Sequence, residues 1–201
     1  MVITAIITGD IVNSREGSNS DWLESLKLAL NRYGDHLKDW EIYRGDSFQL
    51  KTNIEKSLEA CFYIKASIKE YNSLDVRMAI GIGESNGSTG KITEEQGEAF
   101  YRSGQCFENL KATNLAIETG NKEHNTVLNL MLELGLLTFN SWTSVDAVTL
   151  KTALKHPGHT QKEIAKKLNK SASTISFTLQ KTGYKEILKL LNYYNNLIVK
   201  P

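Results

Sequence analysis

Cysteine, proline and long apolar segments are scarce in this chain. Its 201 residues include two cysteines, Cys61 and Cys106, and two prolines. Each cysteine lies in an amphipathic helical pattern, which favours buried free thiols over a disulfide or a metal pair, and two prolines leave no proline-rich linker. No apolar run approaches the length of a bilayer-spanning helix, and the N-terminal segment lacks the features of a signal peptide. We therefore expect a cytoplasmic protein without a membrane partner.

Charge is divided unevenly between the two parts of the chain. Residues 145–201 contain ten Lys and three acidic residues, a net charge of +7. Residues 1–144 contain fourteen Lys and Arg against twenty Asp and Glu, a net charge of −6, so the total of +1 conceals both. A basic module attached to an acidic one indicates a nucleic-acid contact made by the C-terminal part alone.

Strand and helix patterns alternate through the acidic part. Apolar or alternating segments typical of strands occur at 2–12, 40–45, 47–52, 76–84 and 113–118. Amphipathic helical patterns separate them, with one hairpin signal at Gly45-Asp46. This order predicts an α+β fold with a ferredoxin-like or palm-type mixed sheet over residues 1–140. The first two strands are joined through a helix, so we expect them to pair in parallel and to bring Asp10 close to Asp46.

The pattern changes to helices alone beyond the helix whose apolar residues recur at Val127, Leu130, Met131, Leu134 and Leu137. Residues 144–155, 161–168, 171–181 and 184–198 have helical spacing, with breaks at His156-Pro157-Gly158 and Gly183. We therefore expect a second, small all-α domain over residues 141–201. No flexible linker separates it from the first, which predicts close packing of the two.

The segment TQKEIAKKLNKSASTISFTLQKTGY has the spacing of a helix-turn-helix. Ala165 lies where the two helices would touch, and Leu168, Ile175 and Leu179 are spaced to pack against it. The N-terminal part of the second helix enters the major groove in such motifs, and lysines around it can neutralise phosphates. The candidate DNA-contacting residues are Lys166, Lys167, Lys170, Ser171, Ser173, Thr174, Ser176 and Lys181. The alternative is a helical bundle with a basic solvated face.

Arginine is absent after Arg102, so the tail lacks the commonest bidentate reader of guanine. Gln161 and Gln180 are the longest amide side chains available for base contacts. We expect a weak sequence preference, or a dimer that reads two half-sites.

Two acidic turns at strand ends are candidates for a metal site. Asp10 ends the first strand within TGDIVNSR, and Asp46 lies in YRGDSFQ. Two carboxylates held close together attract a divalent cation such as Mg²⁺ or Mn²⁺, which also binds substrate phosphates. The alternative is that Gly45-Asp46 is only a hairpin turn and that Asp10 caps a loop.

The acidic part resembles the class III nucleotidyl cyclase fold and the related diguanylate cyclase (GGDEF) domain. The resemblance depends on Asp10-Ile11, Gly45-Asp46, the strand VRMAIGIGE and the helix GEAFYRSGQCFENL. With its helix-turn-helix, the whole chain resembles the bacterial SatD family. The resemblance implies a homodimer, and it places the metal ligands at Asp10, Ile11 and Asp46. The residues that would contact a nucleotide or another phosphorylated ligand are Asn13, Ser14, Arg15, Arg44 and Arg102.

Departures from the cyclase pattern leave enzymatic activity open. The positions of the catalytic Asn and Arg, which stabilise charge on the transferring phosphate, hold Tyr101 and Gln105. The purine-selecting Lys position holds Ile42. The metal pair therefore matches the family while the groups that act on the transition state do not.

Three functions agree with these features. The first is a DNA-binding transcriptional regulator whose cyclase-like domain senses a nucleotide or phosphorylated ligand together with a divalent metal. The second is an active cyclase or phosphoryl transferase directed to DNA. The third is a degenerate cyclase-like scaffold that dimerises and presents two DNA-binding tails.

Overall fold

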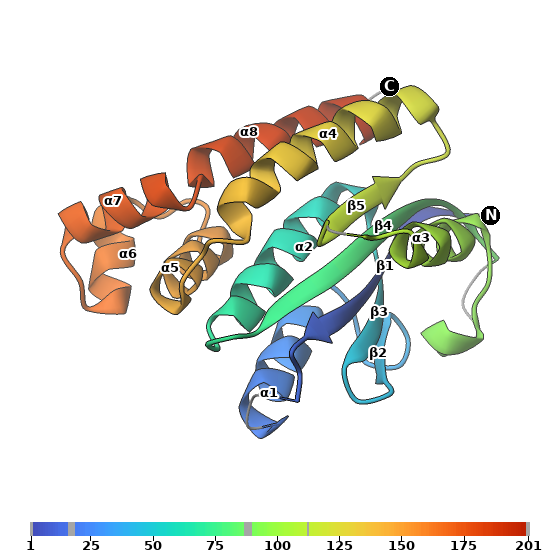
Figure 1. Ribbon diagram of the computed structural model, residues 1–201, viewed down its shortest axis with the longest axis horizontal. Coiled ribbons are helices and arrows are strands. Elements are labelled where there is room, and N and C mark those ends of the chain that lie inside the picture. The colour runs from blue at the N-terminus through green and yellow to red at the C-terminus, as the bar shows by residue number, and fades with distance from the viewer. Residues whose placement is uncertain (1, 16–18, 87–89, 112, 200–201) are drawn as a thin grey trace.

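A computed structural model describes residues 2–15, 19–86, 90–111 and 113–199, and within them the chain forms one five-stranded mixed sheet (Figure 1). The strands lie in the order β2-β3-β1-β4-β5. Their bounds are β1 Val2–Val12, β2 Trp40–Tyr43, β3 Ser47–Thr52, β4 Asp75–Ser85 and β5 Leu115–Glu118. The α+β class predicted from the sequence is thereby confirmed.

Eight α-helices accompany the sheet within the described residues. They are α1 Asn19–Leu30, α2 Ile54–Lys69, α3 Glu98–Glu108, α4 Lys122–Phe139, α5 Ser144–Lys155, α6 Gln161–Leu168, α7 Ala172–Lys181 and α8 Tyr184–Tyr194. A short 3-10 helix, η1 Ile92–Glu94, precedes α3, and a π-helical turn, η2 Asn195–Val199, follows α8. The succession of strands and helices agrees with the one predicted from the periodicity.

The predicted parallel pairing of the first two strands is wrong. β1 pairs antiparallel with both β3 and β4, and β2 lies one strand further out, beyond β3. β1 and β2 still run in the same direction, because each is antiparallel to β3. A central position buried on both sides suits the β-branched, apolar sequence of β1, and the more polar hairpin β2-β3 occupies an edge.

Helices cover the two faces of the sheet unequally. Residues such as Ile7 of β1 and Ile80 of β4 face the main core, together with α1 and α2. The opposite face is covered by α3, whose close approach to β4 depends on Gly81, since a Cβ there would meet the backbone of Ala99 and Ser103. β2 and β3 extend beyond the strands that α3 covers (Figure 1).

The C-terminal helices α5 and α8 share the core of the sheet domain. Leu150 and Leu154 of α5, with Ile187 and Tyr194 of α8, belong to the same buried cluster as the sheet. By contrast, α6 and α7 pack against Ala153 of α5 in a separate small core, whose other members are Ile164, Ala165, Ile175 and Leu179. The close packing predicted between the two parts of the chain is therefore present, and α6 and α7 project furthest from the sheet (Figure 1).

Candidate ligand sites and nucleic-acid interface

Asp10 and Asp46 lie next to each other at one end of the sheet, as the sequence predicted. The antiparallel register places Asp10 opposite Ser47 on β3, and the Ile11 amide donates to the Asp46 carbonyl at 3.1 Å. The Ile11 side chain is buried in the core, so only its backbone is available to a ligand. The register of β1 against β3, not a parallel β1–β2 pair, brings the two aspartates together.

Arg77 of β4 binds both carboxylate oxygens of Asp10. Its Nε donates to Oδ1 at 3.0 Å and its Nη2 to Oδ2 at 2.5 Å, a bidentate pair. This hydrogen bond raises the pKa of Arg77, and the guanidinium also lies 5.4 Å from the centre of the Phe107 ring. A divalent cation at Asp10 would have to displace a delocalised cation that already binds both oxygens.

Asp46 is also hydrogen-bonded. Ser14 Oγ donates to its Oδ2 at 2.7 Å, and Ser47 Oγ lies 3.5 Å from its Oδ1. The described residues contain no group of three or more His, Cys, Asp or Glu side chains that could hold a metal ion. As arranged, the two carboxylates are supplied with N–H and O–H donors and do not fit a preformed magnesium site.

The other predicted ligand contacts lie in different places. Asn13 has a φ of 62° and donates from Nδ2 to the Ser73 carbonyl at 2.9 Å. Arg15 and Arg44 are exposed near the Asp10 end of the sheet, Arg44 in the β2-β3 turn. Arg102 instead donates to the Ile82 carbonyl at 2.5 Å. Because Ile82 is five residues along β4 from Arg77, Arg102 lies roughly 17 Å from that end.

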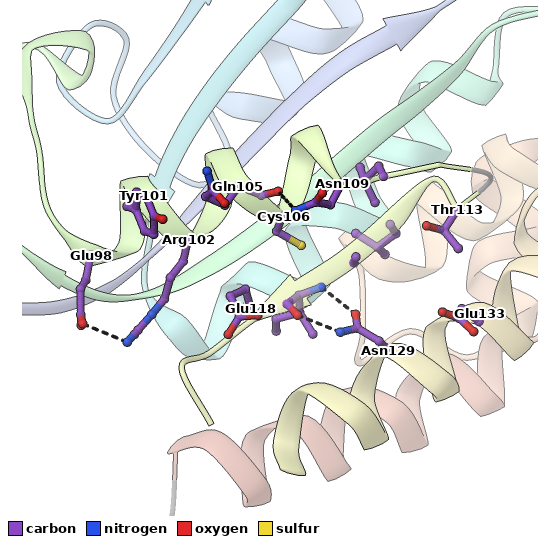
Figure 2. Close-up of a pocket in the computed structure, with 14 residues that line it drawn as sticks. Glu98, Tyr101, Arg102, Gln105, Cys106, Asn109, Thr113, Glu118, Asn129 and Glu133 are labelled. Atoms are coloured by element: carbon purple, nitrogen blue, oxygen red, sulfur yellow. Dashed lines mark hydrogen bonds and ion pairs between the residues drawn. The ribbon is translucent and has the colours of Figure 1, made fainter. Parts of the chain in front are cut away.

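A cavity of about 650 Å³ lies between α3, β5 and α4 (Figure 2). Its wall includes Tyr101 and Gln105, the two residues that stand where the cyclase pattern would have its catalytic Asn and Arg. The charged residues of the wall are Glu98, Arg102, Glu118 and Glu133. Three carboxylates against one guanidinium, which is itself paired with Glu98 at 3.0 Å, disfavour a phosphorylated ligand here.

Asn129 of α4 closes the outer edge of β5 at this cavity. Its Oδ1 accepts from the Ile117 amide at 2.8 Å, and its Nδ2 donates to the Ile117 carbonyl at 2.9 Å (Figure 2). A side-chain amide thus satisfies both backbone groups that a further strand would pair with. Nearby, burial and then the charge of Glu118 raise the pKa of the Cys106 thiol to about 11, so this thiol is protonated at neutral pH.

A cleft of about 690 Å³ between α1–α2 and α5–α6 has the opposite charge. Its wall carries four cationic side chains and no carboxylate: Arg32, Lys151, Lys155 and Lys167, with His156 beside them. Burial and then the positive charges of Lys167, His159, Lys155 and Arg32 lower the pKa of the His156 imidazole. Carboxylates behind the wall pair with two of the cations, Glu70 with Lys151 at 2.6 Å and Glu59 with Arg32 at 3.7 Å.

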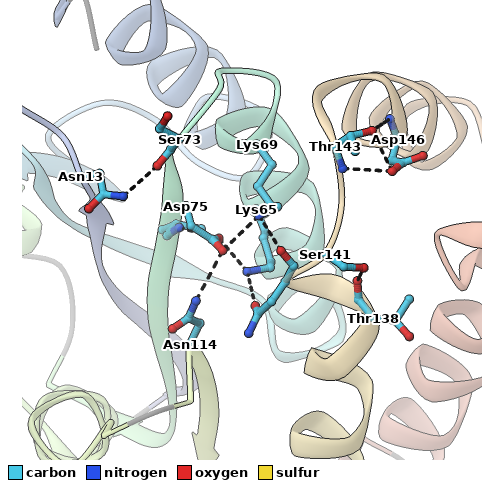
Figure 3. A network of polar contacts seen from close by, with 12 residues as sticks. Asn13, Lys65, Lys69, Ser73, Asp75, Asn114, Thr138, Ser141, Thr143 and Asp146 are labelled. Atoms are coloured by element: carbon cyan, nitrogen blue, oxygen red, sulfur yellow. Dashed lines mark hydrogen bonds and ion pairs between the residues drawn. The ribbon is translucent and has the colours of Figure 1, made fainter. Parts of the chain in front are cut away.

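A polar network joins the sheet to the C-terminal helices (Figure 3). The ammonium of Lys65, which is 1% exposed, donates to Asp75 at 2.6 Å and to Asn140 at 2.9 Å. Lys69 adds a bond to the Asn140 carbonyl at 2.9 Å. Because Asn140 follows α4 directly, this network fixes the direction in which the chain enters α5.

Helices α6 and α7 are joined by a short turn with defined caps. Thr160 and Glu163 form a capping box at the start of α6. Asn169 adopts a left-handed conformation with φ 51° at its end, and Ser171 Oγ accepts from the Thr174 amide at the start of α7. Ala165, Ile175 and Leu179 are buried between the helices, as their spacing predicted.

One side of α7 is exposed along its length. Ser173, Thr174, Ser176 and Phe177 are all exposed, and Phe177 keeps 69% of its surface accessible. Lys166, Lys167, Lys170 and Ser171 are exposed at the end of α6 and in the turn. Lys181 differs from them, because its ammonium pairs with the buried Asp146 at 2.6 Å.

No helix of the described residues is both long and apolar enough to cross a bilayer. Comparison with known protein families, with curated proteins and with solved structures finds no match to this chain.

Proposed function

We propose that this protein is a DNA-binding transcriptional regulator that contacts the duplex through α7. The observation that carries the proposal is the fully exposed face of α7, which combines small hydroxyl side chains with one large aromatic ring beside three exposed lysines. The capped turn and the small shared core of α6 and α7 support a helix-turn-helix. The order β2-β3-β1-β4 within β1-α1-β2-β3-α2-β4 supports a palm-type body.

The chemistry of this face suits the major groove. Hydroxyl groups at Ser173 and Ser176 can exchange hydrogen bonds with base edges or phosphates, and the Phe177 ring can contact thymine methyl groups. The amides at the start of α7, capped by Ser171, suit a backbone phosphate. With Lys181 held by Asp146, the phosphate contacts fall to Lys166, Lys167 and Lys170.

Replacement of Phe177 tests this proposal with a matched control. Phe177→Asp places a carboxylate at the centre of the exposed face of α7, so we expect binding of the full chain to a duplex at low salt to weaken at least about tenfold. Tyr101 of α3 is 67% exposed, close to the 69% of Phe177, and Tyr101→Asp should leave DNA binding unchanged. Equal binding by both variants, or no binding by the wild type, would contradict the proposal.

The regulator is proposed to respond to a phosphorylated ligand, and the basic cleft supports a location for it. A volume of about 690 Å³ suits a nucleotide-sized molecule. The wall carries no carboxylate, and although Arg32 and Lys151 are paired with Glu59 and Glu70 behind it, Lys155 and Lys167 add positive charge that favours phosphate groups. Since Lys155 and Lys167 belong to the helices that precede α7, a ligand here would alter how α6 and α7 are held. The metal-dependent site at Asp10 and Asp46 is the alternative location.

Thermal stability against a nucleotide panel, with and without Mg²⁺, separates the two locations. We expect a rise in Tm that does not require metal and is lost in the double variant Arg32→Gln, Lys155→Gln. Asp10→Asn and Asp46→Asn should retain it. A metal-dependent shift lost in the aspartate variants would instead assign the ligand to the carboxylate pair.

A second candidate function is a scaffold that binds no ligand and only presents α6 and α7. The bidentate pair between Arg77 and Asp10 favours it, because a salt bridge between neighbouring strands replaces the cation of the cyclase-like site. No shift in Tm with any nucleotide or metal, combined with retained DNA binding, would support this candidate. Tyr101 and Gln105 supply no cation to a transition state, so catalysis is the function that the geometry supports least.

A further inference from the structure

Helix α4 carries two apolar stripes on opposite sides, and only one of them is buried. The inner stripe, Leu128, Leu132, Leu136 and Phe139, is at most 4% exposed and packs into the main core. The outer stripe comprises Val127, Leu130, Met131, Leu134 and Leu137. Leu130, Leu134 and Leu137 are 56%, 62% and 79% exposed. A helix that is apolar all round is normally covered on every side.

The outer stripe has the spacing of a helix–helix seam. Val127, Leu130, Leu134 and Leu137 follow one another at intervals of three, four and three residues. This is the a/d repeat by which two helices interlock over two heptads. A scattered set of exposed leucines would not keep this repeat, and single exposed apolar residues would need no explanation.

A groove beside α4 continues the apolar surface. It encloses about 880 Å³ between α4 and α8, which lie side by side (Figure 1). Fourteen residues line it, Met131, Leu134 and Tyr193 among them. Val127, Leu130 and Leu137 border it on α4, and Leu188 is 42% exposed on α8. Without the buried Phe139, these are seventeen surface residues, close to the roughly 20 a side of a standard protein–protein interface.

We propose that a second copy of this chain covers the outer stripe of α4 and the α4–α8 groove. The charges at the groove suit a copy of the same surface, because Lys181 is already paired with Asp146 and this leaves Glu186 against Lys189. A partner of one charge sign would meet repulsion from half of them, whereas two-fold symmetry can place each sign opposite the other. The sequence of α4 contains one lysine and no arginine, so it lacks the basic face of a membrane-surface helix.

The interface would couple dimerisation to the DNA contact. Gln180 and Lys181 at the end of α7 lie on the wall of the groove. The C-terminal end of each α7 would therefore lie at the interface. The N-terminal part of α7, which carries Ser173 and Thr174, would stay uncovered. This inference is carried by the exposed stripe of α4 and the groove beside it, and it does not depend on whether the duplex is bound.

The oligomeric state of the full chain tests the proposal. We expect a dimer at micromolar concentration in sedimentation equilibrium, and a Tm that rises with protein concentration. Leu134→Glu with Leu137→Glu should weaken dimerisation at least about 100-fold, because two buried leucines are lost and four charges enter one interface. Leu28 of α1 is 70% exposed and lies at the basic cleft between α1–α2 and α5–α6, not at the α4–α8 groove, so Leu28→Glu is the control and should leave the dimer intact.

The outcomes separate cleanly from those of the DNA experiment. Dimerisation lost in the α4 variant and kept in Leu28→Glu, with an unchanged circular dichroism spectrum, supports the interface. A monomeric wild type at 100-fold higher concentration (a few hundred micromolar) would overturn it, as would a dimer that the α4 variant leaves intact. Neither result bears on DNA binding by α7, which the comparison of Phe177→Asp with Tyr101→Asp tests separately.

Discussion

Arg77 on β4 donates hydrogen bonds to both carboxylate oxygens of Asp10 on β1, at 3.0 and 2.5 Å. The two residues face each other directly across the antiparallel β1–β4 ladder. Asp10 is one of the residues that the sequence resemblance selects as a metal ligand, and in this structure its carboxylate already binds a cation supplied by the chain.

Removal of the guanidinium should expose the metal-binding capacity of Asp10. In Arg77→Gln, Asp10 loses its cationic partner while Asp46 remains nearby, so we expect Mn²⁺ to raise the Tm of this variant more than that of the wild type. Adding Asp10→Asn to Arg77→Gln should abolish the difference. A Mn²⁺ shift that is already present in the wild type and is unchanged in Arg77→Gln would show that the two cations coexist.

The buried ion pair of Lys65 and Asp75 should respond asymmetrically to loss of each partner. Burial lowers the pKa of Lys65, and the charge of Asp75 opposes that effect. Asp75→Asn leaves a buried ammonium without a carboxylate and should lower the free energy of unfolding by about 3 kcal/mol or more. Lys65→Met leaves Asp75 with Lys69 at 3.3 Å and should cost less. Urea unfolding of both single variants and the double variant measures this, and equal losses would contradict it.

The two cysteines should differ in reactivity and in its dependence on pH. Burial and the charge of Glu118 raise the pKa of Cys106 to about 11, so at pH 8 its thiolate is on the order of 100-fold scarcer than that of a free cysteine. Alkylation should be slow at pH 8 and accelerate towards pH 11. Glu118→Gln removes the negative charge, lowers this pKa and should speed labelling at pH 8.

Cys61 serves as the internal control for that experiment. It is fully buried, and burial alone raises its pKa. It should remain unlabelled at every pH at which the protein stays folded and react only in denaturant. Labelling of Cys61 before Cys106 would contradict the complete burial of Cys61, since Cys106 is only partly buried.

Asp146 of α5, which pairs with Lys181 at the end of α7, should stabilise the protein in a way that is lost at acid pH. Burial acts to raise its pKa, but hydrogen bonds from Lys181 and Thr143 outweigh burial and lower it below the ordinary carboxyl value. A lowered folded pKa stabilises the protein above the unfolded pKa, about 3.9, and this contribution is lost as the pH falls through the folded value. Thermal unfolding from pH 6 to pH 2 should show a smaller pH-dependent decrease in Tm for Asp146→Asn than for the wild type. Asp35→Asn, at an exposed site, should follow the wild type.

Local periodicity was sufficient to predict the order of strands and helices, including helices α5 and α6 to the residue. It was not sufficient to predict which side of α4 is buried. The sequence of α4 contains two apolar stripes, and periodicity identified the one that is exposed here. The choice between them depends on long-range packing against α2, as between the rings of Phe62 and Phe139, which lie 77 residues apart.

The candidate site shows the same division between local and long-range information. The proximity of Asp10 and Asp46 was predicted correctly, although through a strand pairing that is wrong. Arg77 was missed because its place opposite Asp10 depends on the β1–β4 register, and residues 67 apart in a sheet leave no local signal. The engagement of Lys181 by Asp146 was hidden for the same reason.

The salt dependence of duplex binding tests the central claim most directly. The affinity of the full chain should fall with added salt, and replacing Lys166, Lys167 and Lys170 by Gln should make the slope of log K against log salt concentration shallower by about 3 per chain. The control variant replaces three exposed lysines of the sheet domain, Lys38, Lys111 and Lys122, and should keep the wild-type slope. Equal slopes for both triple variants would show that α6 and α7 do not form the DNA contact.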